Sequence, residues 1–355
     1  MKRGEVGAPP IHNKQPITNH LQMNRDKIIG ALLGTAVGDA LGMPIEGLSH
    51  QNVRTYYKGI KAYRDDDQRG DLDAGQWTDD TQFTFALARV LTAAEGPGAW
   101  PKRAAEAYVA LRTDARRWGP TTTAAVDRLA DGASWDEAGV ATRATNGAAM
   151  RAAPLGAWWA STDAPHDEAL RVLRPVLAVT HRHPGALVAG FGQAWAVRFA
   201  LQHHVKEFDR DAFWAELLDV TTWAEAQFED AEGRVSRRIE QLAGHLRDFP
   251  LDLRDLCDGV GIQADASWPF AVAMFARAPH LVENTLLSGI NVGGDADTTG
   301  AMMGALLGAL RGWSAFPDAW HAGLEAQDAL ETQAHALADR IGAKGSSGAD
   351  AFGSG

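Results

Sequence analysis

The sequence predicts an all-α fold, and two observations support that prediction. Apolar residues recur at helical spacing along most of the chain, for example at Ile28, Leu32 and Val37, whereas the alternation typical of β-strands is scarce. Helix-breaking glycine and proline residues separate these segments. The clearest breaks are Gly96-Pro97-Gly98, Gly119-Pro120, His183-Pro184-Gly185 and Phe249-Pro250. We therefore expect many packed helices, with the chemistry on loops at one face of the molecule.

The two ends of the chain differ from this helical pattern. Residues 1–24 combine glycines, prolines and polar groups, which is typical of an extended arm before the first helix. Such an arm is either an inert tail or a segment that becomes ordered on a partner protein. Residues 343–355 are rich in glycine and serine and predict a flexible tail.

The first predicted helix carries a glycine at every fourth position, and so does a helix near the other end of the chain. The two sets are Gly30, Gly34, Gly38 and Gly42, and Gly300, Gly304, Gly308 and Gly312. Because glycine costs roughly 1 kcal/mol relative to alanine inside a helix, these positions require a compensating interaction. Our hypothesis is that the two helices lie centrally and pack closely through these glycines. The alternative is a stripe of small residues that faces bulky side chains.

Two aspartate clusters precede apolar helical segments at distant points of the chain. They are Trp77-Thr78-Asp79-Asp80-Thr81 and Gly293-Gly294-Asp295-Ala296-Asp297-Thr298. Taken singly, the first cluster is as typical of a helix start as of a metal site, and the second is as typical of a polar turn as of a metal site. Taken together, they predict two helix N-termini that converge on one oxygen-lined metal site. Hard cations such as Mg²⁺, Mn²⁺ or Ca²⁺ prefer such oxygens, and four carboxylates balance two divalent ions.

Composition argues against several other classes of protein. The formal net charge of −11 does not fit a basic nucleic-acid-binding surface or attraction to anionic membranes. The longest apolar stretches fall short of the ~20 residues needed to cross a bilayer, and the N-terminus has no apolar signal core. The single cysteine, Cys257, cannot form an intrachain disulfide, which fits a reducing compartment. We therefore expect a cytoplasmic protein without nucleic-acid or membrane partners.

Five segments, in order along the chain, resemble the ADP-ribosylglycohydrolase family, which includes the dinitrogenase reductase-activating type. They are Gly38-Asp39-Ala40-Leu41-Gly42-Met43-Pro44-Ile45-Glu46, Thr78-Asp79-Asp80-Thr81, Asn146-Gly147-Ala148-Ala149-Met150-Arg151, Thr180-His181 and Gly293-Gly294-Asp295-Ala296-Asp297-Thr298. The first and last segments are the most specific. The resemblance spans residues 28–312 and implies one helical domain over residues 25–342.

The resemblance also implies roles for individual residues. Two Mg²⁺ ions, with Mn²⁺ as the alternative, would be held by Thr78, Asp79, Asp80, Asp295, Asp297 and Thr298. Catalysis would involve Glu46, Asp80 and Asp295, with Glu46 as general base or as a group that orients the substrate. Substrate would be bound by Asn146, Gly147, Arg151 and His181. Without the resemblance, Glu46 is better read as an exposed turn acid and His181 as a capping or core residue, while Arg151 is equally typical of a structural ion pair.

The implied activity is hydrolysis of the bond between ADP-ribose and a protein side chain, with arginine as the favoured linkage. The partner would then be an ADP-ribosylated protein. One alternative is an immunity protein that neutralises an ADP-ribosyltransferase toxin, by hydrolysis, by direct binding through the N-terminal arm, or by both. Another is a non-catalytic binding or structural relative, which the complete set of metal-ligand types argues against.

Overall fold

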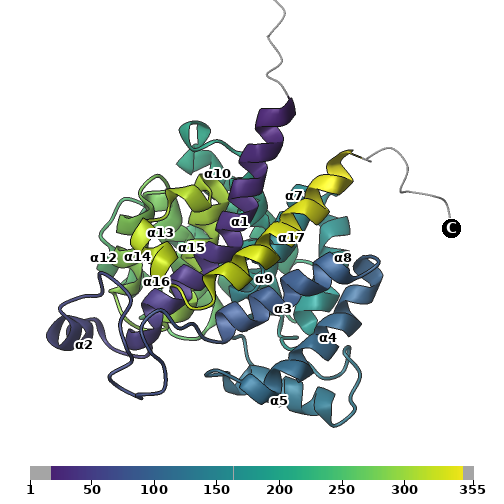
Figure 1. Ribbon diagram of the computed structural model, residues 1–355, viewed down its shortest axis with the longest axis horizontal. Coiled ribbons are helices and arrows are strands. Elements are labelled where there is room, and N and C mark those ends of the chain that lie inside the picture. The colour runs from purple at the N-terminus through teal and green to yellow at the C-terminus, as the bar shows by residue number, and fades with distance from the viewer. Residues whose placement is uncertain (1–16, 163, 347–355) are drawn as a thin grey trace, which may run out of the picture.

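Packed α-helices make up the described part of the chain, as the sequence predicted. The computed structural model describes residues 17–162 and 164–346, and among them β-structure is limited to three isolated bridges. Two helices lie at the centre, α1 (Ile17–Gly42) and α15 (Ala296–Arg311), and the others surround them (Figure 1). α1 also packs on α17 (Gln327–Ser346) and α3 (Asp79–Ala93), whereas α15 packs on α9 (Pro184–Gln202), α13 (Ala264–Arg277) and α14 (Val282–Ile290).

The remaining helices are mostly short and pack around these elements. They are α2 (His50–Asn52), α4 (Trp100–Ala110), α5 (Pro120–Ala130), α6 (Gly147–Met150), α7 (Ala153–Ala160), α8 (His166–Ala178), α10 (Arg210–Glu225), α11 (Arg234–Leu242), α12 (Pro250–Leu256) and α16 (Asp318–Gly323). Single turns of 3-10 helix occur at η1 (Met43–Ile45), η3 (Pro97–Ala99), η4 (Leu111–Asp114), η5 (Val205–Glu207) and η6 (Trp313–Ala315), and η2 (Val53–Tyr57) is a π-helix.

The glycine stripes of α1 and α15 face each other, which confirms the close-packing hypothesis. A Cβ atom added to Gly34 would lie 2.2 Å from the carbonyl oxygen of Gly304, and one added to Gly38 would lie 1.9 Å from that of Gly300. The obstructing atoms belong to the backbone, so no change of side-chain rotamer could make room for a methyl group. The two helices therefore pack backbone against backbone, at a separation that only glycine permits.

Helix starts follow the proline signals in the sequence. Pro120, Pro184 and Pro250 each occupy the first position of a helix, where the missing N–H has no intrahelical partner to lose.

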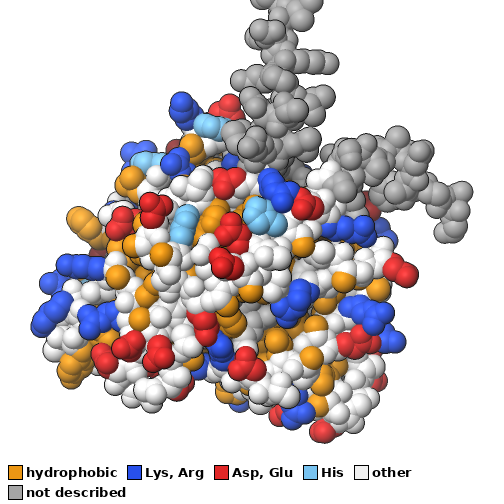
Figure 2. All heavy atoms as spheres, in the orientation of Figure 1, with side chains coloured by type: hydrophobic (Ala, Val, Ile, Leu, Met, Phe, Trp, Pro, Cys, Tyr) orange, Lys and Arg blue, Asp and Glu red, His pale blue; other side chains and the backbone are white. Residues whose placement is uncertain are grey.

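Apolar side chains of the helices join one hydrophobic core, which includes Trp100, Trp159, Trp195 and Trp268. Figure 2 shows side chains of both charge signs scattered over the visible face, without a broad basic surface.

Both ends differ from the expected boundaries. Residues 17–24 were expected to form part of an extended arm, but they are the first turns of α1. Likewise α17 continues to Ser346, past the expected start of the tail at residue 343. Adding a residue to an existing helix requires no new nucleus, which accounts for both extensions. The rest of the expected arm and tail, residues 1–16 and 347–355, lies outside the described residues.

One segment is longer and more apolar than the sequence analysis expected. Arg25–Ile45 contains 21 residues with a mean hydropathy of 1.6, which meets the length and composition of a membrane-spanning helix. Its most apolar window is completely buried inside the fold. The segment therefore has the character of a core helix, whose continuous hydrophobicity reflects contacts on all sides.

Candidate metal centre and cleft

The first aspartate cluster forms the N-terminus of α3. Thr78 precedes the helix, Asp79 and Asp80 begin it, and all three are buried. The backbone N–H groups of Thr78 and Thr81 both donate to the carboxylate of Asp39 on α1, at 3.0 Å. The first turn of α3 is therefore held against the middle of the molecule.

The second cluster lies in the turn that leads into α15. Gly293 and Gly294 both have a φ of +80°, a conformation that side chains disfavour, and a Cβ on Gly294 would lie 2.2 Å from the carbonyl oxygen of Val260. The Gly294 amide donates to the carbonyl of Leu48, while the Gly294 carbonyl accepts from the amide of Gly47. These bonds place Glu46 beside Asp295 and Asp297.

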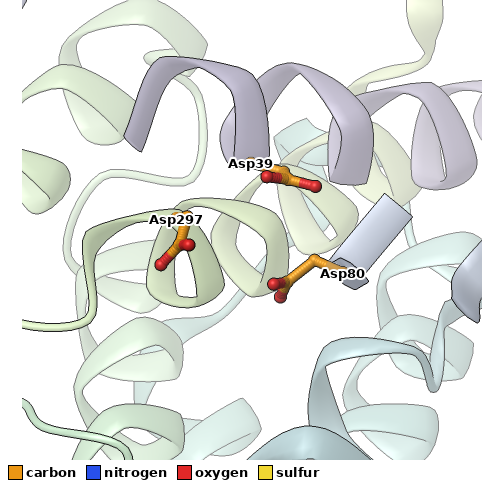
Figure 3. A group of neighbouring side chains, drawn as sticks. All are labelled: Asp39, Asp80 and Asp297. Atoms are coloured by element: carbon orange, nitrogen blue, oxygen red, sulfur yellow. The ribbon is translucent and has the colours of Figure 1, made fainter. Parts of the chain in front are cut away.

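Four aspartates from three helices and one loop, together with Glu46, form two overlapping groups. One carboxylate oxygen from each of Asp39, Asp80 and Asp297 lies within 4.8 Å of the others, and the three side chains gather from α1, α3 and α15 (Figure 3). One carboxylate oxygen from each of Glu46, Asp295 and Asp297 likewise lies within 4.8 Å of the others. Asp297 belongs to both groups. This arrangement matches the predicted convergence of the two clusters.

Electrostatics make these acids unfavourable as bare carboxylates. Burial raises the pKa of Asp39 and Asp295 to about 6. For Asp79, Asp80 and Asp297, burial and then neighbouring carboxylates raise the pKa well above its ordinary value. A bound cation reverses this preference, because it stabilises the charged carboxylates.

The oxygens available also fit a hard cation. Oδ1 of Asp80 is buried and has no hydrogen-bond partner among the described residues. Its Oδ2 accepts only long hydrogen bonds from the hydroxyls of Thr78, at 3.4 Å, and Thr298, at 3.3 Å. A buried polar atom without a partner costs free energy, and a divalent ion would satisfy it.

Glu46 occupies the edge of this centre and interacts with two arginines. Its Oε2 accepts from Arg69 at 2.5 Å and lies 3.5 Å from Arg117, and its side chain is 24% exposed. Arg117 also pairs with Asp66 and Asp71. Glu46 is thus a fixed carboxylate that is more exposed to solvent than Asp295 and Asp297 beside it.

A cleft beside the acidic groups opens to solvent. Eight of the predicted site residues line it: Glu46, Asp79, Asn146, Gly147, His181, Asp295, Asp297 and Thr298. The lining also includes Gly119–Thr122, at the N-terminus of α5, and Arg143. Among the described lining residues His181 carries the only aromatic ring.

Asn146 and Gly147 shape the cleft floor. The side-chain amide of Asn146 donates to Asp295 at 2.5 Å and to Ser267 at 3.0 Å, so it orients one of the acids. Gly147 packs directly against the imidazole of His181, because a Cβ there would lie 2.5 Å from Cε1 of that ring. Burial lowers the pKa of His181 well below its ordinary value, which keeps the ring neutral.

Arg151 does not line the cleft, contrary to its predicted contact with substrate. Its side chain is completely buried and donates to the carbonyls of Gly147 and Leu177 and to the hydroxyl of Thr180, at 2.5, 3.1 and 2.6 Å. Its guanidinium lies over the rings of Phe83 and Tyr108. Arg151 therefore supports the cleft floor from inside, and Thr78 and Asp80 likewise lie beneath the surface of the cleft.

Asp39 and Arg117 are among the site residues that received no role from the sequence. Asp39 stands next to Gly38 in the first of the five motifs, and the available signal was a charged residue within the otherwise uncharged segment 28–42. Arg117 follows no motif, and only the fold brings it to Glu46. A local pattern cannot reveal a contact between segments so distant in the chain.

Comparisons with known proteins point to one family. Residues 21–347 match the model of the ADP-ribosylglycohydrolase family. An uncharacterized protein of Archaeoglobus fulgidus is 32% identical over 314 residues, covering 88% of this chain and 96% of that protein. The ADP-ribosyl-[dinitrogen reductase] glycohydrolase of Rhodospirillum rubrum is 29% identical over 307 residues, covering 83% of this chain and 89% of that one.

A solved structure is similar over the same extent. It is described as an ADP-ribosylglycohydrolase-related protein complex, has a TM-score of 0.71 and 29% sequence identity, and the match covers 90% of this chain and 99% of the other. The fold, the acidic centre and these similarities lead to one conclusion: the chain belongs to the ADP-ribosylglycohydrolase family.

Proposed function

We propose that this protein hydrolyses the glycosidic bond between ADP-ribose and a protein side chain, with arginine as the favoured linkage and two Mg²⁺ ions at the acidic centre. The observation that carries this proposal is the pair of acid groups that share Asp297 beneath an open cleft. Family membership supports a hydrolase of glycosyl bonds, and the Rhodospirillum rubrum relative is named for that activity on ADP-ribosyl-dinitrogen reductase.

The metal ligands would be the residues that the sequence analysis named, with Asp297 common to both groups and Glu46 beside Asp295. Bound divalent ions would neutralise the buried acids, hold substrate hydroxyls and polarise a water molecule. Mn²⁺ has the same preference for oxygen ligands and remains the alternative.

The residues of the cleft would stabilise charge on the sugar, act on water or orient the substrate, and bind the rest of ADP-ribose. Cleavage of a glycosidic bond develops positive charge on the sugar, which nearby carboxylates stabilise. Glu46 is the solvent-accessible acid of the centre, and Arg69 and Arg117 hold its carboxylate in place. It would accept a proton from the attacking water or orient the substrate, and both roles require a fixed side chain. The part of ADP-ribose beyond the reacting ribose would bind in the cleft beside Gly147 and His181.

The test is a panel of arginine- and serine-linked ADP-ribosyl substrates, incubated with the purified chain in Mg²⁺ or in EDTA. Free ADP-ribose, separated by chromatography, is the readout. We expect Mg²⁺-dependent release, greatest for arginine, and loss of release in Asp297→Asn. Asp219→Asn is the matched control, because that aspartate is exposed on α10. Absence of release from every substrate, with metal bound, would contradict the proposal.

The complete set of acids favours a catalytic protein over a non-catalytic relative, since each buried carboxylate costs folding energy without its cation. The role of an immunity protein against an ADP-ribosylating toxin stays a prediction. Its expected contact segment falls largely in residues 1–16, outside the described residues.

A further inference from the structure

Asp39 is a fully buried acid on α1 whose hydrogen bonds all lead to the start of α3. Its Oδ1 accepts from the amide and hydroxyl of Thr78, at 3.0 and 2.9 Å. Its Oδ2 accepts from the amide of Thr81 at 3.0 Å and from the hydroxyl of Thr81 at 2.6 Å. Two backbone and two side-chain donors from one helical turn thus converge on a single carboxylate.

These bonds replace the N-cap that α3 would otherwise need. Thr78 is the N-cap residue, but its own side chain makes no capping hydrogen bond among the described residues. In an ordinary helix the N-cap side chain accepts from the third helical amide, which here belongs to Thr81. Asp39 accepts from that amide instead, across the helix–helix interface. The hydroxyl of Thr78 and the carboxylates of Asp79 and Asp80 are therefore not consumed by capping.

Asp39 and Asp80 differ sharply in the oxygens that remain for a cation. A carboxylate offers about four lone-pair sites, and the donors from Thr78 and Thr81 occupy those of Asp39. Oδ1 of Asp80 has no partner among the described residues. Proximity alone places both acids in one group, but only Asp80 presents a free oxygen.

α1 also fixes the other half of the centre. Gly38, next to Asp39, packs on Gly300. A Cβ on Gly42 would lie 2.2 Å from the carbonyl oxygen of Ala296, the residue that separates Asp295 from Asp297 in the sequence. One helix therefore contacts α3 through Asp39 and α15 through its glycines. The spacing between the two aspartate clusters depends on both contacts.

We propose that Asp39 is a positioning residue: it caps α3 from α1 and so sets Asp79 and Asp80 opposite Asp297, without itself binding metal. This inference rests on the proposed function only in requiring that the centre binds divalent cations. Hydrogen-bonded groups behind metal ligands typically contribute about 10- to 100-fold to metal affinity when removed.

The experiment is a Mn²⁺ titration of the full chain without substrate, in which EPR measures the free aqueous ion. Asp39→Asn places an amide N–H against the donors of Thr78 or Thr81. Thr81→Val removes one donor and leaves every carboxylate in place, and Thr81→Ser restores the hydroxyl. Asp80→Asn removes an expected ligand and serves for comparison. Hydrogen exchange of the Thr78 and Thr81 amides, measured without metal, reports the cap directly.

We expect Asp39→Asn and Thr81→Val to weaken Mn²⁺ binding by about 10- to 100-fold while the number of ions bound at saturation equals that of the wild type. Thr81→Ser should bind like the wild type, and the amides should lose protection in Asp39→Asn. Asp80→Asn should bind fewer ions.

Loss of an ion in Asp39→Asn would make Asp39 a ligand and overturn the inference. Wild-type affinity in both Asp39→Asn and Thr81→Val would overturn it as well. If Asp39→Asn does not fold, Thr81→Val and its serine counterpart decide the question. A wild-type chain that binds no Mn²⁺ would contradict the proposed function itself, which is a distinct result.

Discussion

At the residue scale, Arg151 stabilises the cleft floor through three hydrogen bonds and two aromatic contacts, all inside the protein. Replacement by methionine would remove the guanidinium donors from the carbonyl of Gly147 and the hydroxyl of Thr180, and would leave the carbonyl of Leu177 with the longer bond from the amide of His181, at 3.3 Å. We predict that Arg151→Met lowers the free energy of unfolding by about 3 kcal/mol or more, measured by urea denaturation. Arg143→Met, an exposed arginine of the same segment, should change it by no more than about 0.5 kcal/mol. Equal effects of the two substitutions would contradict the buried role.

His181 should make stability depend on pH. Burial, and then the charge of Arg151, lower its pKa in the folded chain, whereas the unfolded chain titrates near 6.5. The unfolded state therefore binds more protons below that pH, so His181 contributes full stability above it and loses this contribution as pH falls. We predict that the wild type loses stability relative to His181→Gln below about pH 6.5, with a slope approaching 1.4 kcal/mol per pH unit. Parallel curves from pH 8 to 5, both measured in EDTA, would contradict this.

Several site residues were predictable because their chemistry is local. Asp79, Asp80, Asp295 and Asp297 stand in two short motifs at helix N-termini. The structure groups Asp80 with Asp297 and Asp295 with Asp297, and Asp79 lines the same cleft as Asp295 and Asp297. The structure places Arg151 inside the protein rather than in the cleft, because burial decides whether an arginine faces a ligand or a carbonyl, and sequence spacing does not reveal burial. Asp39 was missed for a related reason, since its donors lie about forty residues away on another helix.

At the element scale, the contact between α1 and α15 requires glycine for close approach. In Gly34→Ala the new methyl group would meet the backbone of Gly304, so one helix must move. We predict a loss of about 3 kcal/mol or more in the free energy of unfolding. Gly342→Ala on α17 is the matched control: there a Cβ would meet no described atom within 4 Å, and stability should rise by up to about 1 kcal/mol. Chemical denaturation of both variants checks the pair, and a tolerated alanine at position 34 would contradict the close contact.

The sequence predicted the long elements better than the short ones. Glycine spacing predicted the α1–α15 contact, and proline predicted the starts of α5, α9 and α12. The π-helix η2 and the four-residue helix α6 are too short to show a hydrophobic period, so only their tertiary contacts define them.

At the scale of the whole molecule, the acidic centre should link metal binding to stability. Five aspartates are buried in one region, and a ligand that binds only the folded state stabilises it by about 2.7 kcal/mol at one hundred times its dissociation constant. We predict that saturating Mg²⁺ or Mn²⁺ raises the thermal midpoint by several degrees relative to EDTA at matched ionic strength. Asp297→Asn should abolish most of this shift. Calorimetric scans check both statements, and a wild-type midpoint that does not respond to metal would contradict them.

We propose that two divalent ions bind side by side at this centre and share Asp297. Anomalous scattering at the manganese edge, from crystals of the full chain grown with Mn²⁺ and ADP-ribose, tests it most directly. We predict two anomalous peaks that flank Asp297, one beside Asp80 and one beside Asp295, with Asp39 bound to neither. Peaks elsewhere, or a single peak remote from Asp297, would contradict the account.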